Sequence, residues 1–233
     1  MSIIRMSRMR ALTAALAATL VLAACGSGNS TPDTTVPEVS LRIVSLSPTA
    51  TEMLYAIGAG DQVVAVDSLS TFPAEVTDKV TKISAYEPSA EAILGYTPDV
   101  VLISNDMNKI TEQLQSVSSQ KITVWTGAAA ATLDDVYKQI TELGELTGHD
   151  KDAATLIESM KSRIAKATEN ISAPMAAKSY FYELDNTLYS VTSNTFVGAL
   201  LKPFGFTNIA DGVEAGNDYP QLNAEVIAKA NPS

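Results

Sequence analysis

Small polar and aromatic side chains are the part of this sequence best suited to chemistry. They gather at the ends of segments that the sequence predicts to be β-strands. Hydroxyl, amide, carboxylate and phenol groups of this kind bind a ligand by hydrogen bonding and ring contact, without making or breaking a bond. We expect these residues to bind a ligand: Asp67, Ser68, Tyr86 and Asn105 in the first half of the chain, and Ser193, Asn194 and Tyr219 in the second.

The residues that most catalytic and metal sites require are scarce. His149 is the single histidine and Cys25 the single cysteine, so neither several imidazoles nor several thiolates can surround one metal ion. His149 lies in a polar joint between two expected helices, where a helix-end role is expected. Gly58-Ala59-Gly60 follows an expected helix and precedes an expected strand, whereas the glycines of a dinucleotide-binding fingerprint follow a strand and precede a helix. No GxSxG or GxxxxGK[ST] motif occurs in the sequence. We therefore predict no enzyme activity, no resident cofactor and no metal site.

An alternation of strands and helices must position the binding residues. Apolar, β-branched runs alternate with helical segments, which predicts a mostly parallel sheet covered on both faces. Ligands of such sheets bind beyond the carboxyl ends of the strands. The expected strands are 41–46, 62–66, 81–83, 99–103 and 121–125, and the expected helices are 48–57, 89–95, 107–117 and 133–147.

A long helix then interrupts the alternation, from Asp150 to about Asn170. Its expected apolar face consists of Ala154, Ile157, Met160, Ile164 and Ala167. After it we expect strand 178–184, helix 195–202, a strand near 207–210 and helix 223–230. The predicted fold class is α/β, with two Rossmann-like lobes that contain parallel sheets. The first lobe is 41–149, the connecting helix is 150–172, and the second lobe is 173–233.

A short internal repeat relates the two lobes. Ala90-Glu-Ala-Ile is followed by Pro98, and Ala224-Glu-Val-Ile is followed by Pro232 at the same spacing. An apolar strand follows Pro98, whereas only Ser233 follows Pro232. We therefore expect the second lobe to be truncated in this sequence.

The first 40 residues predict export and anchoring rather than folded structure. Three arginines precede an apolar run at 11–22 that is short for a membrane span, and Leu22-Ala-Ala-Cys25 is typical of a bacterial lipoprotein signal. We predict a signal peptide at 1–24, a lipid on Cys25 and a flexible tether at 25–40, with the protein at the extracytoplasmic face of the cell membrane. The alternative is an ordinary secretory signal.

The charge of the chain excludes one class of partner. The net charge is −10, and it becomes −13 without residues 1–24, because these contribute three arginines and no acid. A surface of this sign does not favour nucleic acid.

Three motifs resemble those of one protein family. Arg42-Ile-Val-Ser-Leu-Ser-Pro-Thr-Ala-Thr-Glu52, Ile57-Gly-Ala-Gly60, and Glu91-Ala-Ile with Pro98-Asp-Val-Val-Leu102 occur in this order. They resemble the substrate-binding lipoproteins of ABC importers for cobalamin, ferric siderophores and haem. The resemblance runs from about Leu41 to the last residue.

The resemblance implies a monomeric solute-binding protein that captures a metal chelate and delivers it to an ABC permease dimer with a cytoplasmic ATPase. It places Tyr86 and Tyr219 at positions similar to tryptophans of the cobalamin binders, and Ser104-Asn105 where those carry a further tryptophan. It also implies that Glu91 and Glu225 meet arginines of the permease. The chelate stays open among corrinoid, haem and ferric siderophore. The alternatives are an envelope α/β enzyme and a structural lipoprotein without a transport role.

Overall fold

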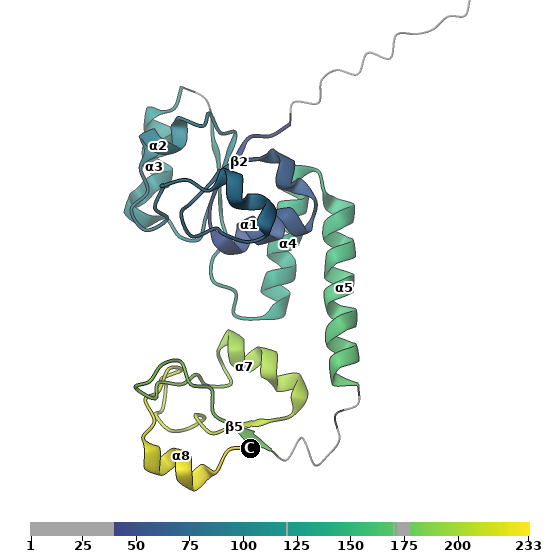
Figure 1. Ribbon diagram of the computed structural model, residues 1–233, viewed down its shortest axis with the longest axis vertical. Helices are drawn as coiled ribbons and strands as arrows, with labels where there is room; N and C mark the ends of the chain where they lie inside the picture. The colour runs from purple at the N-terminus through teal and green to yellow at the C-terminus, as the bar shows by residue number, and fades with distance from the viewer. Residues whose placement is uncertain (1–39, 120, 170, 172–177) are drawn as a thin grey trace, which may run out of the picture. The chain divides into compact units, whose positions relative to one another are not determined.

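The computed structural model describes residues 40–119, 121–169, 171 and 178–233, so the predicted signal peptide and nearly all of the tether lie outside the described residues. The first lobe contains a parallel sheet of strand order β2-β1-β3-β4, and helices lie around this sheet (Figure 1). This arrangement confirms the predicted α/β class. The strands are β1 (Ile43–Leu46), β2 (Val63–Val66), β3 (Val100–Ile103) and β4 (Thr123–Thr126).

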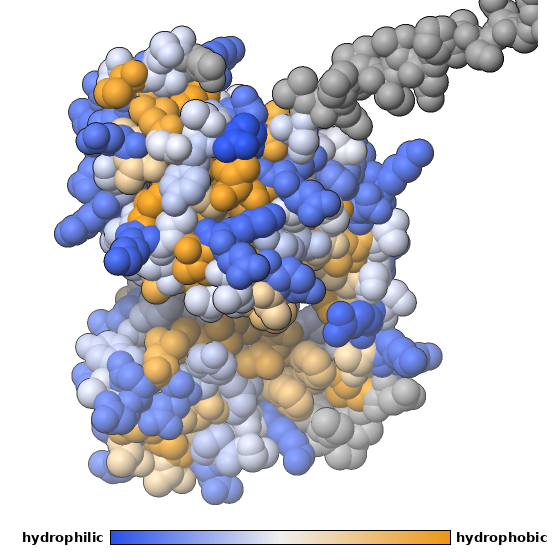
Figure 2. Space-filling model, turned by 45° about the horizontal axis from the view of Figure 1, so that its top comes forward, coloured by the Kyte–Doolittle hydropathy of each residue, from blue (hydrophilic) through white to orange (hydrophobic). Residues whose placement is uncertain are grey.

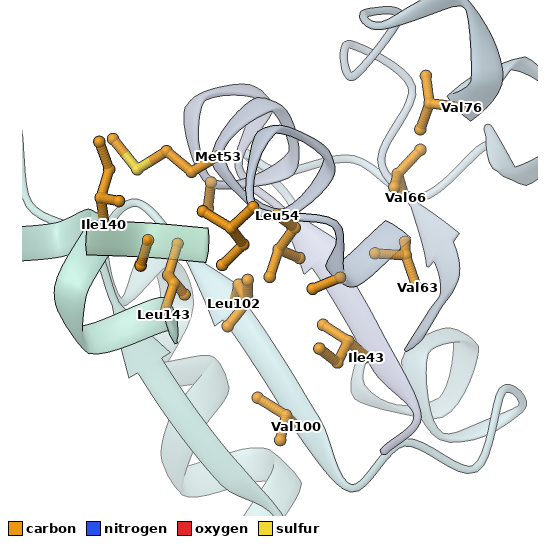
Figure 3. Close-up of a cluster of buried hydrophobic side chains, with 14 of the residues drawn as sticks. Ile43, Met53, Leu54, Val63, Val66, Val76, Val100, Leu102, Ile140 and Leu143 are labelled. Carbon is orange, nitrogen blue, oxygen red and sulfur yellow. The ribbon is translucent and has the colours of Figure 1, made fainter. Parts of the chain in front are cut away.

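Both faces of this sheet are covered, which explains why β1, β2 and β3 are mostly apolar and buried. Ile43 and Leu102 pack on one face with residues of α1, α4 and α5 (Figure 3). Val44 and Ile103 pack on the other face with residues of α2 and α3. The helices are α1 (Pro48–Ala56), α2 (Ala90–Leu94), α3 (Ile110–Val117), α4 (Leu133–Thr147) and α5 (Asp150–Thr168), with short 3-10 turns at Ala59–Gln62, Ala74–Lys79 and Met107–Lys109.

Local signals fix the ends of these helices. The Ser47 side chain accepts a hydrogen bond from the N–H of Ala50, and Pro48 occupies the first turn of α1. Thr132 and Asp135 form a capping box at the start of α4. His149 occupies the N-terminal cap position of α5, and its Nδ1 lies 3.4 Å from Asp152. The expected helix-end role of His149 is thereby confirmed.

Two expected elements of the first lobe are wrong. Segment 81–83 is not a strand. The N–H of Thr81 donates to the carbonyl of Val66, but the pairing amounts to one isolated bridge between Val66 and Val80, and the Thr81 hydroxyl then accepts from the N–H of Ile83. The expected helix 107–117 is broken at its start, where Asn108 and Lys109 have positive φ angles, so α3 begins at Ile110.

The apolar face of α5 is shifted from the expected one. Ala153 and Ile157 are buried, and Met160 packs against the same cluster, whereas Ala154 and Ala167 are exposed. The face follows the contact with α4, where the Cβ of Ala153 fits closely against Gly144. The helix ends at Thr168.

The second lobe has a small parallel sheet, β5 (Ser179–Tyr180) with β6 (Thr207–Asn208), and helices α7 (Phe196–Leu201) and α8 (Ala224–Ala230), with a 3-10 turn at Lys202–Phe204. The expected strand 178–184 is thus too long. The chain turns at Asp185–Leu188, and the N–H of Leu184 donates to the carbonyl of Tyr189. Residues 181–184 therefore do not pair with β6.

The internal repeat predicted from sequence has a structural counterpart. Glu91 and Glu225 occupy the same place in α2 and α8, two residues after a capping side chain, Ser89 and Asn223 respectively. The residue after the repeated proline also makes the same kind of hydrogen bond in each lobe. The N–H of Asp99, after Pro98, donates to the carbonyl of Arg42, next to β1. The N–H of Ser233, after Pro232, donates to the carbonyl of Ser179 in β5.

No helix in the described part of the chain combines the length and the apolar character needed to cross a bilayer. Apolar groups on the face of the molecule in Figure 2 form small patches among hydrophilic ones.

Gly198 sets the packing of α7 on the preceding loop. A Cβ at this position would lie 2.4 Å from both the carbonyl oxygen of Thr192 and the Cα of Ser193. We expect Gly198→Ala to destabilise the protein by about 1–3 kcal/mol, because backbone atoms must move to admit the methyl group. The control Gly95→Ala places a methyl group no nearer than 3.4 Å to any atom. Equal denaturation midpoints for both variants would contradict this packing.

Candidate ligand-binding site

All four strands of the first lobe lead into the same edge of the sheet. Ser47 follows β1, Asp67 follows β2, Ser104 and Asn105 follow β3, and Gly127 follows β4. Parallel strands end at one edge, so the residues that follow them gather there. Two adjoining pockets lie at this edge, and Ser104 and Asn105 line both of them.

The larger of these pockets has a volume of about 390 Å³. Its first-lobe lining is mostly small and apolar, with a few polar groups. Trp125 borders it and donates a hydrogen bond from Nε1 to Glu142 Oε2 at 3.0 Å. Other lining residues include Ser47, Thr49, Met53, Gly127 and Gln139. Such a lining fits an extended, partly apolar ligand surface.

The smaller pocket, of about 160 Å³, brings together three of the residues expected from sequence: Asp67, Tyr86 and Asn105. Tyr86 is 65% exposed, so its ring is available for contact with a ligand. Ser68 is also exposed but lies outside the lining of both pockets, and its N–H donates to the carbonyl of Ile83.

Hydroxyl groups that hydrogen-bond to one another stiffen this edge of the sheet. The Ser104 hydroxyl donates to Ser47 Oγ at 2.9 Å. Thr51 Oγ1 lies 2.9 Å from Ser45 Oγ and 3.1 Å from Ser70 Oγ. Because these polar groups satisfy one another, they hold the strand ends and the start of α1 in fixed positions.

In the second lobe, two aspartates hold the expected residues Ser193 and Asn194. Asp211 accepts hydrogen bonds from the N–H and the hydroxyl of Ser193, at 2.8 and 2.7 Å. Asp218 accepts from the Thr192 hydroxyl at 2.6 Å and from Asn194 Nδ2 at 3.1 Å. The two donors lower the pKa of Asp218, the hydroxyl of Thr192 more than the amide.

Tyr219 directly follows Asp218 and is 56% exposed. Tyr180 in β5 lies near Ser193 and Asn208. Burial raises the pKa of Tyr180, and the negative charge of Asp211 adds to this effect. The second-lobe residues Ser193, Asn194 and Tyr219 therefore belong to one loop cluster supported by hydrogen bonds.

Several residues of the site were not predicted from sequence. Ser47 caps α1 and also accepts the hydrogen bond from Ser104. Trp125 and Gln139 come from β4 and α4, and only the place of Trp125 near the end of an expected strand could have indicated its role. Asp211 and Asp218 lie in loops and accept hydrogen bonds from Ser193 and Asn194, which are distant in sequence. No sequence motif indicates these contacts.

Other features of the first lobe lie away from the strand ends. A larger, open pocket of about 460 Å³ runs beside α1 and is lined by Glu52, Tyr55, Phe72 and other residues. Among the described residues, no group of three or more His, Cys, Asp or Glu side chains is arranged to hold a metal ion. The predicted lipid-bearing residue, Cys25, lies outside the described residues.

Comparison with known proteins identifies the family. A family model described as "Periplasmic binding protein" matches residues 43–233. The chain belongs to this periplasmic binding protein family. The family resemblance and the fold expected from sequence are both confirmed.

Two sequence relatives are about one third identical to this family member over the aligned residues. A cobalamin-binding protein of Halobacterium salinarum is 31% identical over 217 residues, which are 90% of this chain and 58% of that protein. An "uncharacterized ABC transporter substrate-binding lipoprotein", YvrC of Bacillus subtilis, is 33% identical over 208 residues, which are 87% of this chain and 65% of that protein. The chain thus spans about three fifths of the length of these relatives.

Solved structures show the same fold. A periplasmic solute-binding protein of Staphylococcus epidermidis, described as possibly iron-binding, matches with a TM-score of 0.70 and 25% identity, over 82% of this chain and 74% of that one. The haem-binding protein HutB of Vibrio cholerae also matches with a TM-score of 0.70, at 23% identity, over 83% and 74% of the two chains. At this level of identity, the match to HutB shows only that the two proteins share a fold.

The hydrogen bonds of Asp218 predict an acid-sensitive loop in the second lobe. A depressed pKa means that the folded loop favours the ionised carboxylate, so its contribution to stability is present above the ordinary pKa of 3.8 and is lost as the pH falls through the lower folded value. We expect the carboxyl carbon resonance of Asp218 to titrate below 3.8, and Thr192→Val to raise the midpoint.

Asp185 provides an internal control for this titration. Thr187 lowers the pKa of Asp185 in the same way, and the Thr192→Val substitution removes none of its partners. A midpoint for Asp218 that stays unchanged in the variant would contradict the assigned hydrogen bonds.

Proposed function

We propose that the chain is an extracytoplasmic solute-binding protein that captures a metal chelate and delivers it to an ABC permease. The observation that carries this proposal is the pair of adjoining pockets at the carboxyl edge of the first-lobe sheet, into which all four strands lead. Their lining offers hydroxyl, amide and aromatic groups suited to reversible binding. The names of the relatives as binding proteins support the same function.

The proposed ligand is a corrinoid, a haem or a ferric siderophore. The relative from Halobacterium salinarum is named for cobalamin, and the structural neighbours are named for iron or haem. Tyr86 and Tyr219, both more than half exposed, are the aromatic surfaces proposed to contact the chelate. The chelate is cargo rather than a resident cofactor.

We also propose that Cys25 carries the lipid that holds the protein at the outer face of the cell membrane. The lipoprotein signal around Cys25 supports this anchor, as does the naming of the Bacillus subtilis relative as a lipoprotein. The tether at 25–40 would then let the folded part reach the permease.

Glu91 and Glu225 are the proposed contacts with the permease. Both are exposed, and both occupy the second position of a capped helix. A carboxylate in this place also favours the helix dipole. Their equivalent positions in two related lobes match the two subunits of a permease dimer, where arginines could form charge-assisted hydrogen bonds with them.

Titration of the single tryptophan tests ligand capture. Trp125 borders the larger pocket, so a coloured chelate bound there should quench its fluorescence. We expect Tyr86→Ala and Tyr219→Ala each to weaken binding by about 1–3 kcal/mol, the size of a lost aromatic contact. Phe72→Ala is the matched control, because Phe72 is 62% exposed but lies beside the other pocket.

Affinity must be expressed per folded molecule, with the folded fraction taken from circular dichroism. If the tyrosine variants lose stability but bind each chelate as the wild type does, the rings serve only packing. If corrinoid, haemin and ferric siderophore all fail to quench Trp125 or to raise the melting temperature, the proposed function is wrong.

Transport assays test the docking residues separately from capture. We expect Glu91→Gln and Glu225→Gln to leave chelate affinity unchanged and to reduce uptake, with the double variant worse than either. Glu91→Arg and Glu225→Arg should reduce uptake further, since they would face the permease arginines with like charge. Glu52→Gln, an exposed acid on α1, is the control. Normal uptake by both glutamine variants would leave these residues only their helix-start role.

A further inference from the structure

Asp67 lines the smaller pocket, and one of its carboxylate oxygens is buried without a partner. Asp67 is fully buried. Its Oδ1 accepts a hydrogen bond from the N–H of Ser70 at 2.9 Å, whereas its Oδ2 is buried without any hydrogen-bond donor. Leaving such an oxygen unpaired costs free energy, so its retention at a pocket wall points to a function.

The neighbouring hydroxyl groups do not supply the missing donor. Ser70 Oγ interacts with Thr51 Oγ1, and Thr51 in turn with Ser45. The hydroxyl of Ser104, another lining residue of this pocket, donates to Ser47. The hydroxyl chain is therefore complete without Asp67.

The charge around the pockets also points to a particular ligand chemistry. Asp67 is the one charged residue among the described residues that line either pocket, and none of those residues is basic. A ligand group with a negative charge would meet the carboxylate without any compensating cation. A group that donates a hydrogen bond would instead satisfy Oδ2.

We propose that Asp67 Oδ2 selects chelates that present an N–H donor, a primary amide or an ammonium group, over chelates that present carboxylates. The inference rests on the proposed function and adds to it the chemistry that the smaller pocket accepts. At about 160 Å³ this pocket holds a side group rather than a whole macrocycle. The body of the chelate would lie in the adjoining larger pocket, across Ser104 and Asn105.

The test compares three probes on the full chain solubilised in detergent. Cyanocobalamin carries peripheral amides, ferrioxamine B carries an ammonium group, and haemin carries carboxylates. In Asp67→Asn the side-chain oxygen that accepts from Ser70 is kept, while an NH₂ group replaces Oδ2. The variant therefore replaces a hydrogen-bond acceptor by a donor at this position, with little change in the shape of the side chain.

We expect Asp67→Asn to weaken the better bound of the two N–H probes about 10- to 100-fold, the scale of a hydrogen bond to a charged group. The affinity for haemin should stay the same or rise. The probe that loses affinity shows whether the pocket takes an amide or an ammonium group. Asp61→Asn, an exposed acid of the same lobe, removes the same charge and should change neither affinity.

The ratio of affinities separates specificity from folding. A loss of folded protein lowers all apparent affinities by one factor, so an unchanged ratio between the N–H probe and haemin overturns the inference while leaving chelate capture intact. That result would mean that solvent or the fold itself satisfies Oδ2. If none of the probes binds the wild type, the proposed function fails for these chelates and the inference falls with it.

Discussion

The burial of both faces of the first-lobe sheet is the constraint on which the site depends. Ile43 and Leu102 point to one set of helices, and Val44 and Ile103 to the other. The core takes up nearly all side chains of β1, β2 and β3, so these strands leave little to bind a ligand from either face. Apart from Trp125 of the edge strand β4, the polar and aromatic binding groups therefore come from residues outside the strands, and the pockets lie where the strands end.

The same constraint explains why the edge is rigid. Short loops leave little freedom between a strand end and the next helix, and the hydroxyls of Ser47, Thr51 and Ser104 link these ends by hydrogen bonds. A preformed edge of this kind lowers the entropy that a ligand must remove on binding. The second lobe reaches a comparable result with Asp211 and Asp218, which hold Ser193 and Asn194 in place.

Patterns that depend on local chemistry could be predicted from the sequence, and those that depend on packing could not. Helix 133–147 was predicted to the residue because its cap and apolar spacing are local. The buried face of α5 was misplaced because contact with Gly144 sets it. Asp67, Tyr86 and Asn105 were found through their places near strand ends, whereas Trp125 and Gln139 enter the site through a neighbouring strand and helix.

Hydrogen exchange with and without a bound chelate measures most directly whether the carboxyl edge of the sheet is the binding surface. If the chelate binds at this edge, amide exchange becomes slower at 67–70, 84–88 and 104–106, the segments that line or support the smaller pocket. Segments 58–62 and 97–99, which precede β2 and β3 at the opposite edge, should exchange as before. Protection confined to 58–62 and 97–99 would contradict binding at the carboxyl edge.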